Sequence, residues 1–173
     1  HNVGLELLLG LDGVTAVGAD ASKNSIVIAH NKMLRSLEGL RACTTIEGAL
    51  VLQENPGLVS LDGLQSLTAI RGANILGDSI HLYGNPALVS LQLQRNPRLG
   101  GALPHAIGDM ESTSRLQLLN AESCNFTGRV PETLMYSSLA VLRLASNPEL
   151  ISQSGRLPTF LDVDPRRYSD VPG

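Results

Sequence analysis

Short alternations of apolar and other residues recur along the chain, and each one ends at an asparagine. Around Asn31, apolar residues lie five and three positions before the asparagine and three positions after it. The same offsets hold at Asn55, Asn85, Asn96 and Asn147, and Cys124 occupies a sixth such position. A period of two indicates a strand with alternate side chains buried. The pattern predicts short strands that include residues 26–28, 50–52, 80–82, 91–93, 119–121 and 142–144.

These asparagines belong to a longer repeat, N-P-x-L, which starts at residues 55, 85, 96 and 147. A repeat over most of a chain predicts a stack of similar coils rather than a globule. Successive intervals from Asn31 through Cys124 to Asn147 are 24, 30, 11, 28 and 23 residues. A coil of this kind takes about 20–29 residues. The interval from Asn85 to Asn96 therefore predicts either a truncated junction or residues missing there.

The segments that connect the strands differ between the two halves. Residues 36–48 and 60–72 share the pattern SLxGLxxxxxIxG, and residues 10–18 look like the end of another coil whose strand precedes them. Apolar residues at every third position predict an extended or 3₁₀ path. In the second half, the pattern GxφP (φ, apolar) at 101–104, 128–131 and 155–158 predicts 3₁₀ or short helical turns. Beyond it, Phe160, Leu161 and Val163 are candidates for a cap.

With these motifs, the chain resembles the leucine-rich repeat superfamily. Residues 8–90 resemble the receptor L-domain type, and residues 91–158 resemble the plant type, with 159–173 as a C-terminal cap or linker. The resemblance implies one α/β-type solenoid over residues 1–173, a leucine-rich repeat horseshoe. A parallel β-sheet would cover one face and mostly 3₁₀ or extended segments, with little α-helix, the other.

The resemblance also implies a structural role for the repeated asparagines. In this family their side chains bond backbone groups of neighbouring coils and form a ladder, which satisfies buried polar groups. The rungs here would be Asn31, Asn55, Asn85, Asn96 and Asn147, with Cys124 replacing one rung.

Side chains between the buried strand positions should point outward and line up in columns. The early columns are small or apolar, as at Val27 and Val51, and the later ones are polar. Repeat proteins bind partners on such extended faces. We therefore expect a ligand-binding sheet face formed by His81, Tyr83, Gln92, Gln94, Asn120, Glu122 and Arg143. The alternative is that these residues are ordinary solvated sheet positions.

Composition excludes several classes of function. With 43% hydrophobic and 17% charged residues the chain can bury a core, and 3% aromatic residues require an aliphatic one. The net charge of −3 and the scattered basic residues argue against nucleic-acid binding. The longest apolar runs are far shorter than the roughly 20 residues of a membrane span, so we expect no direct membrane insertion by this chain. Because it begins at His1, we expect a fragment of a larger protein.

Few residues suggest chemistry. The four histidines form no HxxxH or HExxH pair, and Cys43 and Cys124 form no CxxC, so we expect no metal, no cofactor and no catalytic residues. Asp162 and Asp164 make a DxD that is better explained as a solvated tail. Cys43 should be a buried free thiol. Asn125 begins the sequon Asn-Phe-Thr, a candidate glycosylation site.

These observations predict a non-enzymatic extracellular or cell-surface recognition module, part of a receptor-like protein, that binds a protein or glycan ligand. One alternative is a structural component of a wall, surface or filament assembly, with lateral self-assembly or a larger complex. A second alternative is a secreted inhibitor-type repeat protein.

Overall fold

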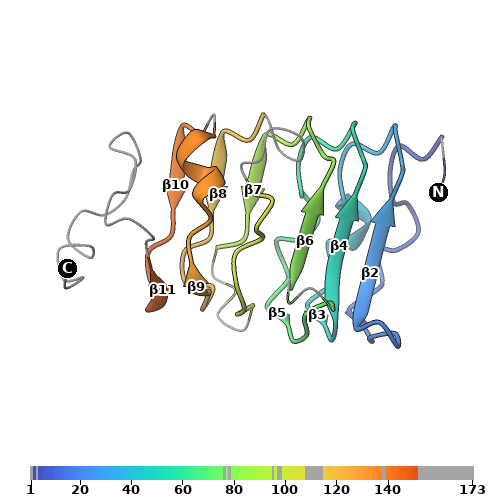
Figure 1. The fold of residues 1–173 in the computed structure, drawn as a ribbon. Helices are drawn as coiled ribbons and strands as arrows, with labels where there is room; N and C mark the ends of the chain where they lie inside the picture. The colour runs from blue at the N-terminus through green and yellow to red at the C-terminus, as the bar shows by residue number, and fades with distance from the viewer. Residues whose placement is uncertain are drawn as a thin grey trace.

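The computed structural model describes residues 2, 4–75, 77, 79–94, 96, 99–107, 115–137 and 139–151. This part of the chain winds into a solenoid of parallel strands with almost no helix (Figure 1). The predicted solenoid is thus confirmed. Its strands are β1 (Ala16–Val17), β2 (Asn24–Ala29), β3 (Thr45–Ile46), β4 (Ala49–Gln53), β5 (Ala69–Ile70), β6 (Ile80–Tyr83), β7 (Ser90–Gln92), β8 (Leu118–Asn120), β9 (Thr127–Arg129), β10 (Val141–Arg143) and β11 (Glu149–Ile151).

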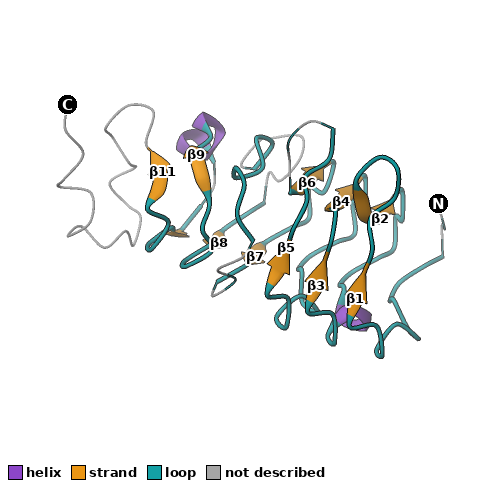
Figure 2. Ribbon diagram, turned by 90° about the horizontal axis from the view of Figure 1, so that it is seen from below, coloured by secondary structure: helices purple, strands orange, loops and turns teal. Residues whose placement is uncertain are grey.

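The strands lie in two rows along the solenoid, which Figure 2 shows from below. The front row consists of β2, β4 and β6 in one sheet, followed by β9 and β11 in another. Between these two sheets the row is continued by residues 101–102: Gly101 lies against the Ser79 side chain, and Ala102 forms a parallel bridge with Thr127.

The second row holds β1, β3 and β5, which form the lower sheet, and β7, β8 and β10, which form the rear sheet. A ladder of backbone hydrogen bonds shows that the rear sheet continues a path already present in the first coils. It passes through Glu6, Arg35, Val59, Val89, Gln117 and Ala140. The prediction of strands on one face only is therefore corrected: every complete coil contributes backbone pairing to more than one side.

The two rows explain the interval of eleven residues. Asn85 lies two residues after the front strand β6, whereas Asn96 lies four residues after the rear strand β7. Asn31 and Asn55 likewise lie two residues after front strands, and Asn147 lies two residues before the front strand β11. Asn85 and Asn96 are consequently two different corners of the same coil. Neither a truncated coil nor missing residues are needed.

Aliphatic side chains from all sides fill the interior. Leu50, Leu52, Leu82 and Leu91 are fully buried, and Phe126 is the one large aromatic side chain among the fully buried residues described. The core is thus built from stacked aliphatic layers, as the low aromatic content predicts.

Connections between strands are mostly extended, with two 3₁₀ segments, η1 (Glu38–Leu40) and η2 (Glu132–Tyr136). η2 begins directly after Pro131, where the GxφP pattern predicts such a turn. In the first half, the glycine of SLxGL permits close packing between coils. A Cβ atom on Gly63 would lie 1.9 Å from the Leu37 carbonyl oxygen, and its φ of +111° also disfavours other residues.

Candidate functional site

A polar groove lies where the lower sheet ends. Two adjoining hollows, of about 120 and 480 Å³, share Gln65, Gln94 and Asn96 and together form what we call the amide groove. Its lining residues are Leu61, Asp62, Leu64, Gln65, Leu67, Thr68, Ser90, Gln92, Gln94, Asn96, Asn120, Glu122 and Arg143. Five of them carry side-chain amides, which can both donate and accept hydrogen bonds.

The groove exists because one coil is shorter on its lower side. Thirty residues separate the paired positions Leu50 and Ile80, and the stretch between them includes β5 of the lower sheet. After β7, the chain is back in the front row at Leu99–Ala102, and none of the described residues between them adds a strand beyond β5. The space that a further strand would fill is left open beside Gln65 and Thr68.

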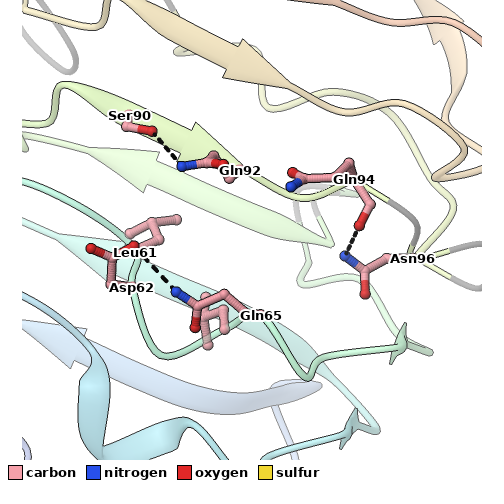
Figure 3. A pocket seen from close by; sticks show the side chains of 8 residues that line it. Leu61, Asp62, Gln65, Ser90, Gln92, Gln94 and Asn96 are labelled. Carbon is pink, nitrogen blue, oxygen red and sulfur yellow. Dashed lines mark hydrogen bonds between the residues drawn. The ribbon is translucent and has the colours of Figure 1, made fainter.

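Hydrogen bonds hold several groove side chains in place (Figure 3). The Gln65 side chain donates to Asp62 Oδ1 (3.2 Å) and accepts from the Gly63 N–H (2.7 Å). Gln92 Nε2 donates to Ser90 Oγ at 3.3 Å. Side chains held in this way lose less conformational entropy when a ligand binds.

Gln94 provides the least satisfied group of the groove. Its side-chain oxygen is buried and has no hydrogen-bond partner in the structure. Buried polar atoms are usually paired, and an unpaired one costs about 1–3 kcal/mol. A ligand or water that donates to this oxygen would relieve that cost once the Gln94 side chain turns toward the groove, since the oxygen is inaccessible in its present position.

The charged lining residues of the groove are Asp62, Glu122 and Arg143. Their formal charges sum to −1, and the rest of the lining is amide, hydroxyl or aliphatic. Such a lining suits uncharged polar groups with both donors and acceptors better than a polyanion or a purely apolar ligand.

The structure divides the predicted contact residues between the two rows. His81 and Tyr83 lie on the front strand β6, and the His81 ring lies 6.0 Å from that of His105. Gln92, Gln94, Asn120, Glu122 and Arg143 line the amide groove. The expectation of one continuous contact face is therefore wrong, because the strand pattern before Asn85 belongs to the front row and that before Asn96 to the rear.

Asn120 needs a further correction. It is only 9% exposed, and its Oδ1 accepts the Glu122 N–H at 3.3 Å. The reason is its place on the central strand β8, where Gln92 and Arg143 flank it in register. Asn120 thus contributes to the floor of the groove instead of projecting from it.

The asparagines form two sets of hydrogen bonds at opposite edges of the front row. At the first, Asn31 N–H donates to Asn55 Oδ1 (3.1 Å) and Asn55 N–H to Asn85 Oδ1 (3.3 Å). At the second, Asn147 Oδ1 accepts from Cys124 and Phe126 N–H groups. Asn96 Nδ2 donates to the Leu93 and Gln94 carbonyls of its own turn.

Cys124 takes a place in the second set. Its thiol, fully buried, donates to the Leu93 carbonyl at 2.8 Å. Burial raises the pKa of this thiol to about 11. The group is therefore protonated at neutral pH and is a hydrogen-bond donor. Cys43 is also buried and free, as predicted, and burial raises its pKa too.

One rung was missed by the sequence prediction. The Asn2 N–H donates to Asn31 Oδ1 at 3.1 Å, which matches the geometry between Asn31 and Asn55. The signal was present: Asn2, Leu5 and Leu8 repeat the spacing of Asn31, Leu34 and Leu37. Without a proline or the preceding strand, that copy was not recognised.

Asn125, the candidate glycosylation site, is exposed and has a positive φ of 57°, between the buried Cys124 and Phe126.

Several predicted features lie outside the described residues: the candidate cap at Phe160, Leu161 and Val163, the third GxφP copy, and Asp162 and Asp164. Within the described residues, no three potential metal ligands of the types His, Cys, Asp and Glu cluster together. That part of the chain also contains no helix long and apolar enough to span a membrane.

Comparisons with protein-family models, with curated proteins and with solved structures find no match to this chain.

Proposed function

We propose that the chain is a non-enzymatic recognition module that binds a protein or glycan ligand in the amide groove. The observation that carries this proposal is the buried, unpaired Gln94 side-chain oxygen in a groove lined by four further amides. Peptide main chains and sugar hydroxyls both present the donors and acceptors that such a lining can pair. Because the groove differs from the front row, we assign His81 and Tyr83 no part in this contact.

The setting we propose is extracellular, in a receptor-like or surface protein whose coils resemble leucine-rich repeats. This part of the proposal is supported by the N-P-x-L repeat and by the sequon at Asn125, which is exposed on a turn. A glycan at Asn125 would fit that setting.

The proposal can be tested with arrays of glycans and of synthetic peptides, probed with the labelled protein. The groove variant combines Gln92→Ala and Arg143→Ala, two exposed residues whose loss should preserve the fold. Each lost ligand hydrogen bond should weaken binding roughly fivefold, so we expect a loss of about tenfold or more.

The matched control is the front variant, His81→Ala with Tyr83→Ala, which should bind as the unchanged protein does. Circular dichroism should show the same β-rich spectrum for all three proteins. If the front variant loses the ligand and the groove variant keeps it, the amide groove is not the site. If no array component binds the unchanged protein, recognition of free glycans and peptides is refuted.

A further inference from the structure

The fold brings together two histidines that are distant in the sequence. His81 and His105 are 24 residues apart, about the length of one coil, and their ring centroids lie 6.0 Å apart with the rings tilted by 51°. The stacking of coils therefore places the two rings side by side. The expectation of no metal rested on the absence of short histidine motifs, and a pair formed by stacking leaves no such motif.

The front sheet holds the backbone of His81. This residue is the outward one of β6 between the buried Ile80 and Leu82, and β6 pairs with β4 along one side. On the other side of the same segment, Gly101 lies against the Ser79 side chain. A strand with neighbours on both sides fixes the point from which the His81 ring projects.

The turn of the next coil holds the backbone of His105. His105 directly follows Pro104, whose ring restricts the backbone, and the flanking Leu103 and Ile107 are buried. The Thr133 hydroxyl donates to the Ile107 carbonyl at 2.6 Å and reaches the His105 carbonyl at 3.4 Å. His105 itself is exposed, so an anchored backbone presents its ring to solvent.

The separation of the rings suits two ligands of one metal ion. A bond of about 2.0–2.1 Å from zinc to an imidazole nitrogen places the ion about 3.2 Å from the ring centre. Two rings on one tetrahedral ion then have centres about 5.2 Å apart, and the limit for a linear arrangement is about 6.4 Å. The observed 6.0 Å lies between these values. Rotation of the two side chains is thus enough to bring both rings onto one ion.

We propose that His81 and His105 form a binding site for a divalent transition-metal ion. Neutral imidazole suits Zn²⁺, Cu²⁺ and Ni²⁺, whereas Mg²⁺ and Ca²⁺ prefer oxygen ligands. Among the described residues, no third His, Cys, Asp or Glu joins the pair. A structural zinc site has four protein ligands, so two ligands define an exchangeable surface site whose other positions are open to water or to a partner's donor group.

The site is separate from the amide groove, because neither histidine belongs to the groove lining. A ring contact alone would be an ordinary aromatic pair, since such pairs have centroids about 4.5–7 Å apart. Replacement of either histidine by phenylalanine distinguishes the two roles. A phenylalanine keeps a ring at the position but has no nitrogen to donate to a metal.

The test is isothermal titration calorimetry of the protein with ZnCl₂, compared among the unchanged protein, His81→Phe, His105→Phe and the double variant. A first ligand should matter more than outer-shell groups, whose loss costs about 10–100-fold in metal affinity. We therefore expect each single variant to bind one Zn²⁺ at least about tenfold more weakly. Because both rings hold the same ion, the double variant should lose that one ion and no more.

The matched controls are His1→Ala and His30→Phe, which change the other two histidines of the chain. Both should keep the Zn²⁺ that the His81 and His105 variants lose. Excess Mg²⁺ or Ca²⁺ should not displace it. Because the ion is not a structural one, removing it with a chelator should leave the circular dichroism spectrum unchanged, and the spectra of all variants should match.

The proposal is overturned if His81→Phe and His105→Phe bind Zn²⁺ as the unchanged protein does, because the rings are then only in contact. It is also overturned if each single variant loses a different ion and the double variant loses two, since the histidines would then act separately. Loss of one shared ion in both single variants, with retention in both controls, supports it.

Discussion

Replacing Asn55 by alanine should destabilise the protein by about 1.5–4.5 kcal/mol. The side chain is 0% exposed; its Oδ1 accepts the Asn31 N–H at 3.1 Å, and its Nδ2 donates to the Ile28 carbonyl at 2.9 Å. Alanine would leave the buried Asn31 N–H unpaired, which costs about 1–3 kcal/mol, and would remove one hydrogen bond to the Ile28 carbonyl, which is also paired with β4 and so loses about 0.5–1.5 kcal/mol. This loss is a large fraction of the roughly 5–15 kcal/mol by which most domains are stable.

The assay is urea unfolding followed by circular dichroism. The matched control is Gln53→Ala, on the same coil, whose side chain makes one surface hydrogen bond of 3.4 Å to Glu54. It should change the free energy of unfolding by less than about 0.5 kcal/mol. A loss below about 1 kcal/mol for Asn55→Ala would show that the corner hydrogen bonds do not support the fold.

A double-mutant cycle tests the assignment of the asparagines to two edges. Asn55 and Asn85 share a direct hydrogen bond between their side chains, so their alanine substitutions should be non-additive by about 0.5–3 kcal/mol. Asn85 and Asn96 share no hydrogen-bond partner among the described residues, so theirs should add within about 0.5 kcal/mol. Strong coupling between Asn85 and Asn96 would instead indicate one continuous ladder and would refute the two-corner coil.

Three further predictions concern other residues. Gly63→Ala should cost about 2–4 kcal/mol in the same unfolding assay, because the new Cβ meets the Leu37 carbonyl and φ is positive, whereas Gly13→Ala, with nothing within 4 Å, should cost less than about 1 kcal/mol. Burial raises the pKa of Cys124 from 9.0 to about 11 in the folded protein, so the unfolded chain loses this proton at lower pH than the folded one does. The protonated thiol therefore contributes roughly 2–3 kcal/mol to the free energy of unfolding below pH 9.0, and this contribution is lost as the pH rises to about 11. Over that interval the free energy of unfolding should fall less in Cys124→Ala than in the unchanged protein. When the protein is expressed through a eukaryotic secretory pathway, mass spectrometry should detect a glycan on it. Thr127→Val should remove this glycan, and Thr127→Ser should retain it. A glycan that is still present on Thr127→Val would exclude Asn125 as the site.

The strands could be predicted from the sequence because each leaves a local signal. Ile26 and Ile28, or Leu142 and Leu144, show the period of two within a few residues, and the asparagine after them marks the turn. The proline-initiated turn at Glu132–Tyr136 was equally local, since the backbone restriction of Pro131 acts on its neighbours.

The relation between the rows could not be predicted in the same way. An asparagine that follows a front strand and one that follows a rear strand have the same local pattern, so Asn85 and Asn96 looked like successive copies of one corner. Only the backbone pairing of Val59 with Val89, and of Val89 with Gln117, places the segment after Asn85 in the rear row. Gln92 and Arg143 therefore lie on the rear strands β7 and β10, whereas His81 and Tyr83 lie on the front strand β6.

The irregular coil and the amide groove have one physical origin. A solenoid with coils of equal length would continue the lower sheet past β5 and cover Gln65 and Thr68 with another strand. The chain is instead back in the front row at residues 101–102, nine residues after β7, so the second corner falls at Asn96 and no described residue of that coil extends the lower sheet. The same shortcut brings Gln94 beside Gln65 and leaves its buried side-chain oxygen without a partner. Inserting a second copy of residues 61–72 after Asn96, to supply a lower strand, should therefore cover Gln65 and Thr68 and abolish ligand binding in the groove. If binding survived that insertion, the groove would not be the consequence of the shortened coil.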